Sequence, residues 1–199
     1  MTRGRAEHAP TAGTARARLL ASADELFYGE GVQSVGIDRV IEHSGVAKAT
    51  LYRLFGSKEH LVAAYLAERH ARNLAELGKA VERHADPVEA LLAVFGTQAR
   101  WLKRRTYRGC AFARATAEPS AGQAVQQAAE AYRAAVRSLL LRLATDAGAE
   151  DPRVLAAQLH TLYHGAEVLA VGGRGSGPID AVRAAARSLI EAALPVADS

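Results

Sequence analysis

The sequence has one cysteine among its 199 residues, so it cannot form an internal disulfide. This fits a reducing compartment, and we expect a cytoplasmic location. Long hydrophobic runs are also missing. The longest stretch without a formal charge, 154–166, is too short to span a bilayer and contains two histidines. The N-terminus lacks the apolar run of a signal peptide, and we expect no contact with a membrane.

Strand-like alternation of valine, isoleucine and threonine is absent, whereas alanine, leucine, glutamate and arginine dominate. The chain also lacks a GxSxG motif, a P-loop, a dinucleotide-binding glycine pattern and a paired acid–base constellation. The glycine-rich segment 172–177 follows an expected helix and is typical of a linker. These absences favour an all-helical protein that is not an enzyme and has no cofactor. A helical enzyme is the weaker alternative.

Apolar spacing and proline positions together predict about nine helices. Proline follows a residue suited to a helix start at Asp86, Glu118, Asp151 and Gly177. The expected helices cover 15–28, 37–44, 48–55, a long stretch from Ser57 toward His84, 87–105, 110–117, 119–147, 152–171 and 178–194.

The sequence pattern of residues 36–59 predicts two short helices separated by a glycine. The first helix, over 37–44, has an apolar stripe, and Gly36 occupies its N-cap position. The free backbone amides of its first turn could hold a phosphate. Gly45 suits the left-handed residue that ends such a helix. Helix-turn-helix proteins use this arrangement to present the second helix to the major groove of DNA.

The second helix of the pair is predicted over 48–55, with Leu51 and Phe55 facing inward four residues apart. Lysine and arginine neutralise phosphates, hydroxyl groups donate to phosphate oxygens, and a small alanine allows close approach to bases. Such side chains make up the predicted outer face: Lys48, Ala49, Thr50, Tyr52 and Arg53. Plain packing in an all-helical protein is the other interpretation of such a helix pair.

The stretch GVAKATLYRLFGSKEHLV, preceded by ELFYGEGVQSVGIDRVIEHS, resembles the N-terminal domain of the TetR/AcrR family of transcriptional regulators. The resemblance implies that Lys48, Thr50, Tyr52 and Lys58 contact DNA. Ala49 and Arg53 lie near these contacts. Three residues depart from the family pattern at positions that often cap helices or contact phosphate: Gly36, Ala47 and Leu54. These departures imply fewer phosphate contacts than average.

The resemblance also implies a domain order. Residues 1–14 would form a flexible basic arm, 15–72 the DNA-binding domain, and 73–199 an effector-binding and dimerisation domain. The implied protein is a repressor that leaves a palindromic double-stranded DNA operator when an unknown small molecule binds. A DNA-binding protein without an effector is the alternative.

A homodimer through the last two helices is expected, because small residues allow close helix approach. Their apolar residues are Leu155, Leu159, Leu162, Ala166 and Leu169, then Ile179, Val182, Ala186, Leu189, Ile190 and Ala193. The alternative is that both helices only cap the core of the monomer.

An effector cavity in the C-terminal domain would be apolar with a few polar groups. The candidate lining residues are Trp101, Tyr107, Cys110, Phe112, Tyr132, His160, Tyr163 and His164. Ordinary core packing is the other interpretation of each. Arg105 and Arg108 could lower the pKa of Cys110 and make it a redox or electrophile sensor, although burial is the default for a lone cysteine.

Two further sequence patterns also have a purely structural interpretation. His160 and His164, with Glu167 three residues on, have a spacing compatible with a metal site. Helical histidine pairs more often pack or lie at interfaces, and we expect no metal. The basic run over 100–108 could attract an acidic effector, but a solvated helix end is the simpler interpretation.

Overall fold

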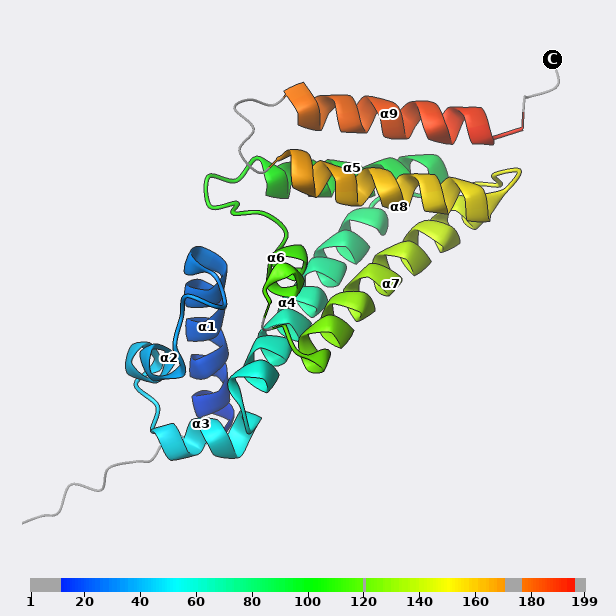
Figure 1. The fold of residues 1–199 in the computed structure, drawn as a ribbon. Helices are drawn as coiled ribbons and strands as arrows, with labels where there is room; N and C mark the ends of the chain where they lie inside the picture. Colours follow the sequence, from blue (N-terminus) through cyan, green and yellow to red (C-terminus); the bar gives the residue numbers. More distant parts are fainter. Residues whose placement is uncertain (1–11, 120, 171–176, 196–199) are drawn as a thin grey trace, which may run out of the picture.

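The computed structural model describes residues 12–119, 121–170 and 177–195, and in these ranges it contains nine α-helices and no strand (Figure 1). The predicted all-helical fold is confirmed. None of these helices combines the length and the apolar character that crossing a membrane requires. The helices are α1 (Ala12–Glu30), α2 (Ile37–Ser44), α3 (Lys48–Phe55), α4 (Lys58–Val81), α5 (Pro87–Leu102), α6 (Ala111–Ala117), α7 (Gln123–Asp146), α8 (Pro152–Leu169) and α9 (Gly177–Ala193).

Local signals set most helix ends. The bounds of α2 and α3 coincide with those predicted, and α5 and α8 begin at the proline after a capping aspartate. Asp86 accepts hydrogen bonds from the backbone N–H groups of Val88 at 2.7 Å and Glu89 at 3.3 Å. Asp151 caps α8 in the same way. Such caps satisfy N–H groups that have no partner within the helix.

The start of α7 differs from the prediction, because the helix begins at Gln123 and not at Pro119. Its N-cap residue, Gly122, has no side chain to offer. The backbone N–H of Ala124 instead donates to Oε1 of Glu59 in α4 at 2.8 Å. The group that caps this helix therefore comes from a distant part of the chain, which no local sequence pattern reveals.

Two other helix ends also shift. α1 begins at Ala12 rather than near Ala15, so the last three residues of the predicted arm are helical. Residues 1–11 of that arm and 172–176 of the predicted linker lie outside the described residues. α5 ends at Leu102, three residues before the predicted end.

The helices form two regions that α4 joins (Figure 1). α1, α2 and α3 pack at one end with the start of α4, and α5, α8 and α9 form a layer at the opposite end. α4 and α7 run side by side between the two ends, and α6 lies beside them. Since α4 continues without a break past residue 72, the domain boundary at 72–73 stays a prediction.

α8 and α9 bury most of their apolar residues in the core of a single protomer: Leu155, Leu159, Ala166, Val182, Ala186 and Ile190. Core capping is therefore the correct interpretation of these six residues. The side chains of Leu169 and Ile179 lie outside the described part. The two helices keep exposed faces of mostly small residues, namely Val154, Ala157, Thr161 and Val168 on α8 and Ala181, Ala184, Ala185, Ser188 and Ala192 on α9.

Candidate nucleic-acid interface

The turn between α2 and α3 depends on Gly45. Its backbone is left-handed, with a φ of 61°, and its N–H donates to the carbonyl oxygens of Ile41 at 2.9 Å and Glu42 at 3.2 Å. A Cβ atom at this position would lie 2.6 Å from Nη2 of Arg18, which itself donates to the carbonyl oxygen of Ser44. The left-handed conformation favours glycine, as predicted, and a larger residue would also displace the Arg18 guanidinium.

α3 has the two faces that its spacing predicts. Leu51 and Phe55 are buried, and Leu54 is half-buried. Tyr52 is 42% exposed, which is unusual for a large aromatic side chain and leaves its ring and hydroxyl open to a partner. Thr50 is half-buried beside it. The remaining side chains of the predicted outer face are all exposed: Lys48, Ala49 and Arg53.

The start of α2 lies next to this outer face. Gly36 is exposed and extended, no side chain caps the helix there, and a Cβ atom at Gly36 would meet nothing within 4 Å. In the first turn, Oδ1 of Asp38 accepts a hydrogen bond from Nζ of Lys48 at 2.8 Å, and Asp38 raises the pKa of Lys48. The ammonium group expected to neutralise a phosphate is therefore already paired with a carboxylate.

Lys58 differs from the other predicted DNA contacts, because its side chain turns toward the protein. It is half-buried, and its Nζ lies 6.0 Å from the ring centroid of Phe27. Burial lowers its pKa, while the charge of Glu118 raises it. Its ammonium group thus interacts with the segment after α6 rather than extending the outer face of α3.

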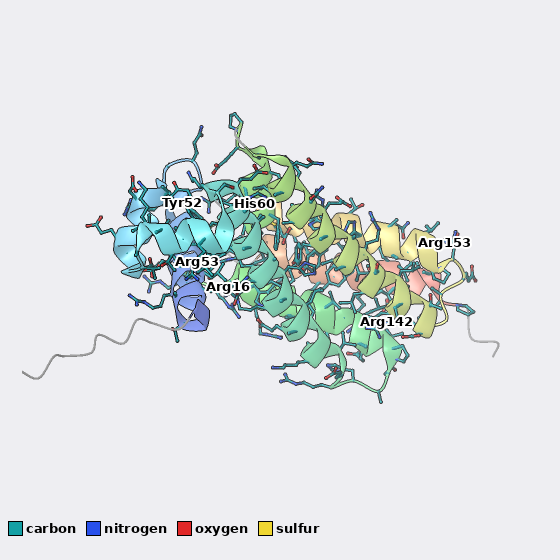
Figure 2. All side chains as sticks on the ribbon, turned by 90° about the horizontal axis from the view of Figure 1, so that it is seen from below. Arg16, Tyr52, Arg53, His60, Arg142 and Arg153 are labelled. Carbon is teal, nitrogen blue, oxygen red and sulfur yellow. The ribbon has the colours of Figure 1, made fainter. Side chains whose placement is uncertain are left out.

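Two residues outside the predicted set lie on the same face as Tyr52 and Arg53 (Figure 2). Arg16 comes from α1, and its guanidinium lies 5.8 Å from the ring centroid of Phe55. His60 is exposed on the first turn of α4. Arg16 and His60 reach this face only because α1 and α4 pack against α3. No pattern in the sequence marks His60 as a DNA contact.

Hydrogen bonds and ring contacts tie α6 and α4 to the end of α1. Nη1 of Arg114 in α6 donates to the carbonyl oxygen of Tyr28 at 2.7 Å, and the backbone N–H of Arg108 donates to the Tyr28 hydroxyl at 2.9 Å. The guanidinium of Arg69 in α4 lies 3.7 Å from the Tyr28 ring centroid and pairs with Asp24. A displacement of α6 would therefore act on α1 directly.

Two hollows flank the segment that leads into α6. The larger, of about 470 Å³, opens between α6, α7 and α8, and the smaller, of about 150 Å³, faces α4 and α5. Gly109, Cys110, Phe112 and Glu167 line both of them. A molecule bound in either hollow would touch the residues that precede α6.

The hollows are lined by six of the predicted pocket residues: Trp101, Tyr107, Cys110, Phe112, Tyr132 and His164. The other two lie behind this surface. Tyr163 is fully buried, and its hydroxyl is 3.1 Å from that of Tyr132. Nε2 of His160 lies 3.1 Å from Nε2 of His164. Core packing is therefore the correct interpretation for Tyr163, and it also describes Phe112 and Tyr132, which are 2% and 1% exposed.

The environment of Cys110 disfavours the thiolate. Burial raises the pKa of its thiol to about 12, and the nearby carboxylate of Glu167 contributes to that rise. Arg105 and Arg108, the expected source of a lowered pKa, are exposed instead. The raised pKa disfavours the interpretation of Cys110 as a thiolate sensor, and its half-buried side chain lines both hollows.

The histidines and the basic run have structural partners. Nδ1 of His164 is 2.9 Å from Oε2 of Glu167, and the described residues contain no group of three side chains placed to hold a metal ion. In the basic run, Lys103 pairs with Asp180 at 2.9 Å and Arg104 pairs with Glu76 at 3.3 Å.

Comparisons with known proteins agree with this geometry. The family model described as bacterial regulatory proteins, TetR family, matches residues 19–65. A TetR-family transcriptional regulator from Streptomyces coelicolor aligns with a TM-score of 0.85 at 29% identity, covering 92% of this chain and 97% of that one. A candidate TetR transcriptional regulator from Streptomyces avermitilis aligns with a TM-score of 0.76 at 30% identity, covering 90% and 97%.

The curated relatives match over shorter stretches. The transcriptional activator FasR of Mycolicibacterium smegmatis is 41% identical over 59 residues, which are 30% of this chain and 26% of that protein. The chain spans less than half the length of the curated relatives it matches.

Proposed function

The chain belongs to the TetR family of bacterial regulatory proteins, and we propose that it is a DNA-binding transcriptional repressor which a small-molecule effector releases from its operator. Two copies would bind a palindromic site, with one α3 helix of each copy in successive turns of the major groove. The observation that carries this proposal is the exposed polar and basic outer face of α3 in a helix-turn-helix.

The side chains around α3 divide into two kinds of contact. The small side chain of Ala49 lies in the first turn of α3 and the hydroxyl of Tyr52 in its middle, on the face that would meet base edges. Arg53, and Arg16 and His60 from the neighbouring helices, surround them on the same face and suit the phosphates that border the groove (Figure 2). Arg3 and Arg5 of the predicted basic arm suit the minor groove, and both lie outside the described residues.

Dimerisation through α8 and α9 is supported by what these helices leave exposed. Most of the large apolar residues serve the protomer core, whereas the exposed faces carry alanine, serine and threonine with Val154 and Val168 at the two ends of α8. Small side chains allow two helix pairs to approach closely in a four-helix bundle. A two-fold operator also requires two copies of the reading helix.

Effector control is supported by the position of the hollows. They lie against Cys110 and Phe112 at the start of α6, and Arg114 of the same helix holds Tyr28 at the end of α1. An effector that binds better when α6 is displaced would therefore change the position of the helix-turn-helix. Effector and operator must then weaken each other by the same factor.

The proposal is tested by selecting fragments of the native genome on the purified full-length protein at a fixed salt concentration. We expect enriched fragments that share a palindromic sequence and show a footprint over both half-sites. The absence of any enriched fragment would contradict specific DNA binding. A reporter gene placed behind the selected site then measures the sign of regulation, and increased expression in the presence of the protein would contradict repression.

A further inference from the structure

The larger hollow beside α6 has one acidic side chain in its lining, Glu167 of α8. This side chain is 11% exposed, and its Oε2 accepts a hydrogen bond from Nδ1 of His164 at 2.9 Å. The surface of the hollow is mostly apolar and includes Phe112 and Tyr132, whose stacked rings have centroids 4.0 Å apart. A carboxylate in such surroundings loses much of its hydration, which is costly unless another charge offsets it.

Three arginines also line this hollow, but none of them forms an ion pair with the carboxylate. Arg114 donates to a backbone carbonyl oxygen of α1 at 2.7 Å, and Arg133 pairs with Glu130 at 2.9 Å. Arg108 is exposed to solvent. Among the described residues, no lysine or arginine forms an ion pair with Glu167.

The hydrogen bonds around His164 are compatible with a neutral ring. Nε2 of His160 is 3.1 Å from the carbonyl oxygen of Arg133 and 3.1 Å from Nε2 of His164. A carbonyl oxygen only accepts, so the contact with Arg133 is a hydrogen bond when Nε2 of His160 carries a proton. In the tautomers that then satisfy all three contacts without an added proton, Nδ1 of His164 donates to Glu167 and its ring is neutral. Glu167 then has no ion-pair partner among the residues that the structure describes.

We infer that the larger hollow binds a lipophilic organic cation, whose charge lies beside Glu167 and whose apolar body contacts Phe112, Tyr132 and Val168. The volume of about 470 Å³ is that of a small-molecule site. The inference rests on the proposed function in one respect, since it names the chemical class of the effector.

Two probes of the same size and shape but opposite charge test this inference: tetraphenylphosphonium and tetraphenylborate. Isothermal titration calorimetry on the full-length protein measures the affinity of each probe. We expect saturable binding of the cation to the full-length protein, at least about tenfold tighter than that of the anion. The net charge of +4 would by itself favour the anion. Equal affinities, a preference for the anion, or no saturable binding of the cation would overturn the inference.

Substitution of the carboxylate provides the second test. Glu167→Gln should weaken tetraphenylphosphonium binding by about tenfold, because the amide has a similar shape but no charge. Glu191→Gln makes the same change on the exposed surface of α9 and should leave binding unchanged. Unchanged cation affinity in Glu167→Gln would contradict the role of this residue. The comparison of the two probes on the unsubstituted protein does not depend on how the variant folds.

Measuring the release of operator DNA distinguishes a failure of this inference from a failure of the proposed function. We expect tetraphenylphosphonium to release the selected DNA from the unsubstituted protein, and to do so only at much higher concentration from Glu167→Gln. Tight, Glu167-dependent binding of the cation without DNA release would support the site and contradict its effector role. DNA binding without any cation binding would contradict the site and leave the DNA-binding part of the proposed function intact.

Discussion

On the outer face of α3, Lys48 is held by a carboxylate before any DNA arrives. Its ammonium group and Asp38 are both well exposed, at 59% and 77% of their side chains. An exposed ion pair of this kind contributes little to stability and exchanges partners readily. DNA binding would replace Asp38 with a phosphate, so the acidic residue reduces the gain from this contact.

Substitutions at this pair should change the salt dependence of operator binding. Lys48→Ala should lower the slope of the logarithm of affinity against the logarithm of salt concentration by about 1, because one phosphate contact is lost. Asp38→Asn should strengthen binding at low salt. Lys79→Ala, an exposed lysine in the last turn of α4, serves as the control and should leave the slope unchanged. An unaltered slope in Lys48→Ala would contradict the phosphate contact.

Cys110 should react slowly with alkylating reagents, since only the thiolate is nucleophilic and the pKa of this thiol is raised to about 12. A raised pKa means that the neutral thiol persists as the pH rises. The rate of iodoacetamide labelling of the folded protein should therefore increase about tenfold per pH unit between about pH 7 and about pH 9 without levelling off. A rise well below tenfold between about pH 8 and about pH 9 would show an ordinary or lowered pKa.

At the scale of helices, the sequence predicts those helix ends that depend on residues close together in the chain. α2 and α3 end where expected because Gly45 and the apolar positions act within a few residues of each other. The start of α7 and the inward position of Lys58 depend on Glu59 and Glu118, which approach from distant parts of the chain. Those contacts exist only in the folded protein, so no local sequence pattern predicts them.

The cap that Glu59 provides for α7 can be tested with two glycine substitutions. Gly122→Ala would place Cβ 2.2 Å from Cδ of Glu59 and push the carboxylate away from Ala124. We expect a loss of about 1 kcal/mol in the free energy of unfolding, the usual contribution of a helix cap. Urea denaturation measures it.

Gly78→Ala is the matched control, because Gly78 lies within α4 and a Cβ atom there meets nothing within 4 Å. This change should raise the free energy of unfolding by about 0.5–1 kcal/mol, since alanine suits a helix better than glycine. A Gly122→Ala variant as stable as Gly78→Ala would rule out the capping role of Glu59.

At the scale of the whole molecule, the proposed dimer depends on the faces of α8 and α9 that do not pack into the protomer core. The apolar periodicity of α8 and α9 identifies core residues correctly, but it does not distinguish the core of one protomer from a contact between two. Only the folded structure, which buries Val182, Ala186 and Ile190, distinguishes the exposed alanines of α9 from its core residues.

A charge placed on the exposed face of α9 should separate the two copies. We expect Ala184→Arg to sediment as a monomer at micromolar concentration, because it would bury an unpaired guanidinium between closely packed helices. Ala131→Arg makes the same change on the exposed surface of α7 and should stay dimeric. A dimeric Ala184→Arg, or an unsubstituted protein that sediments as a monomer, would contradict the proposed interface.

The central claim is that the outer face of α3 recognises duplex DNA. The most direct measurement is the ratio of affinities for the selected operator and for a scrambled duplex of equal length at one salt concentration, comparing the unsubstituted protein with the Thr50→Ala, Tyr52→Ala double variant. We predict that the ratio falls by at least about tenfold, while the temperature of unfolding stays the same. An unchanged ratio in a folded, dimeric variant would show that another surface reads the DNA.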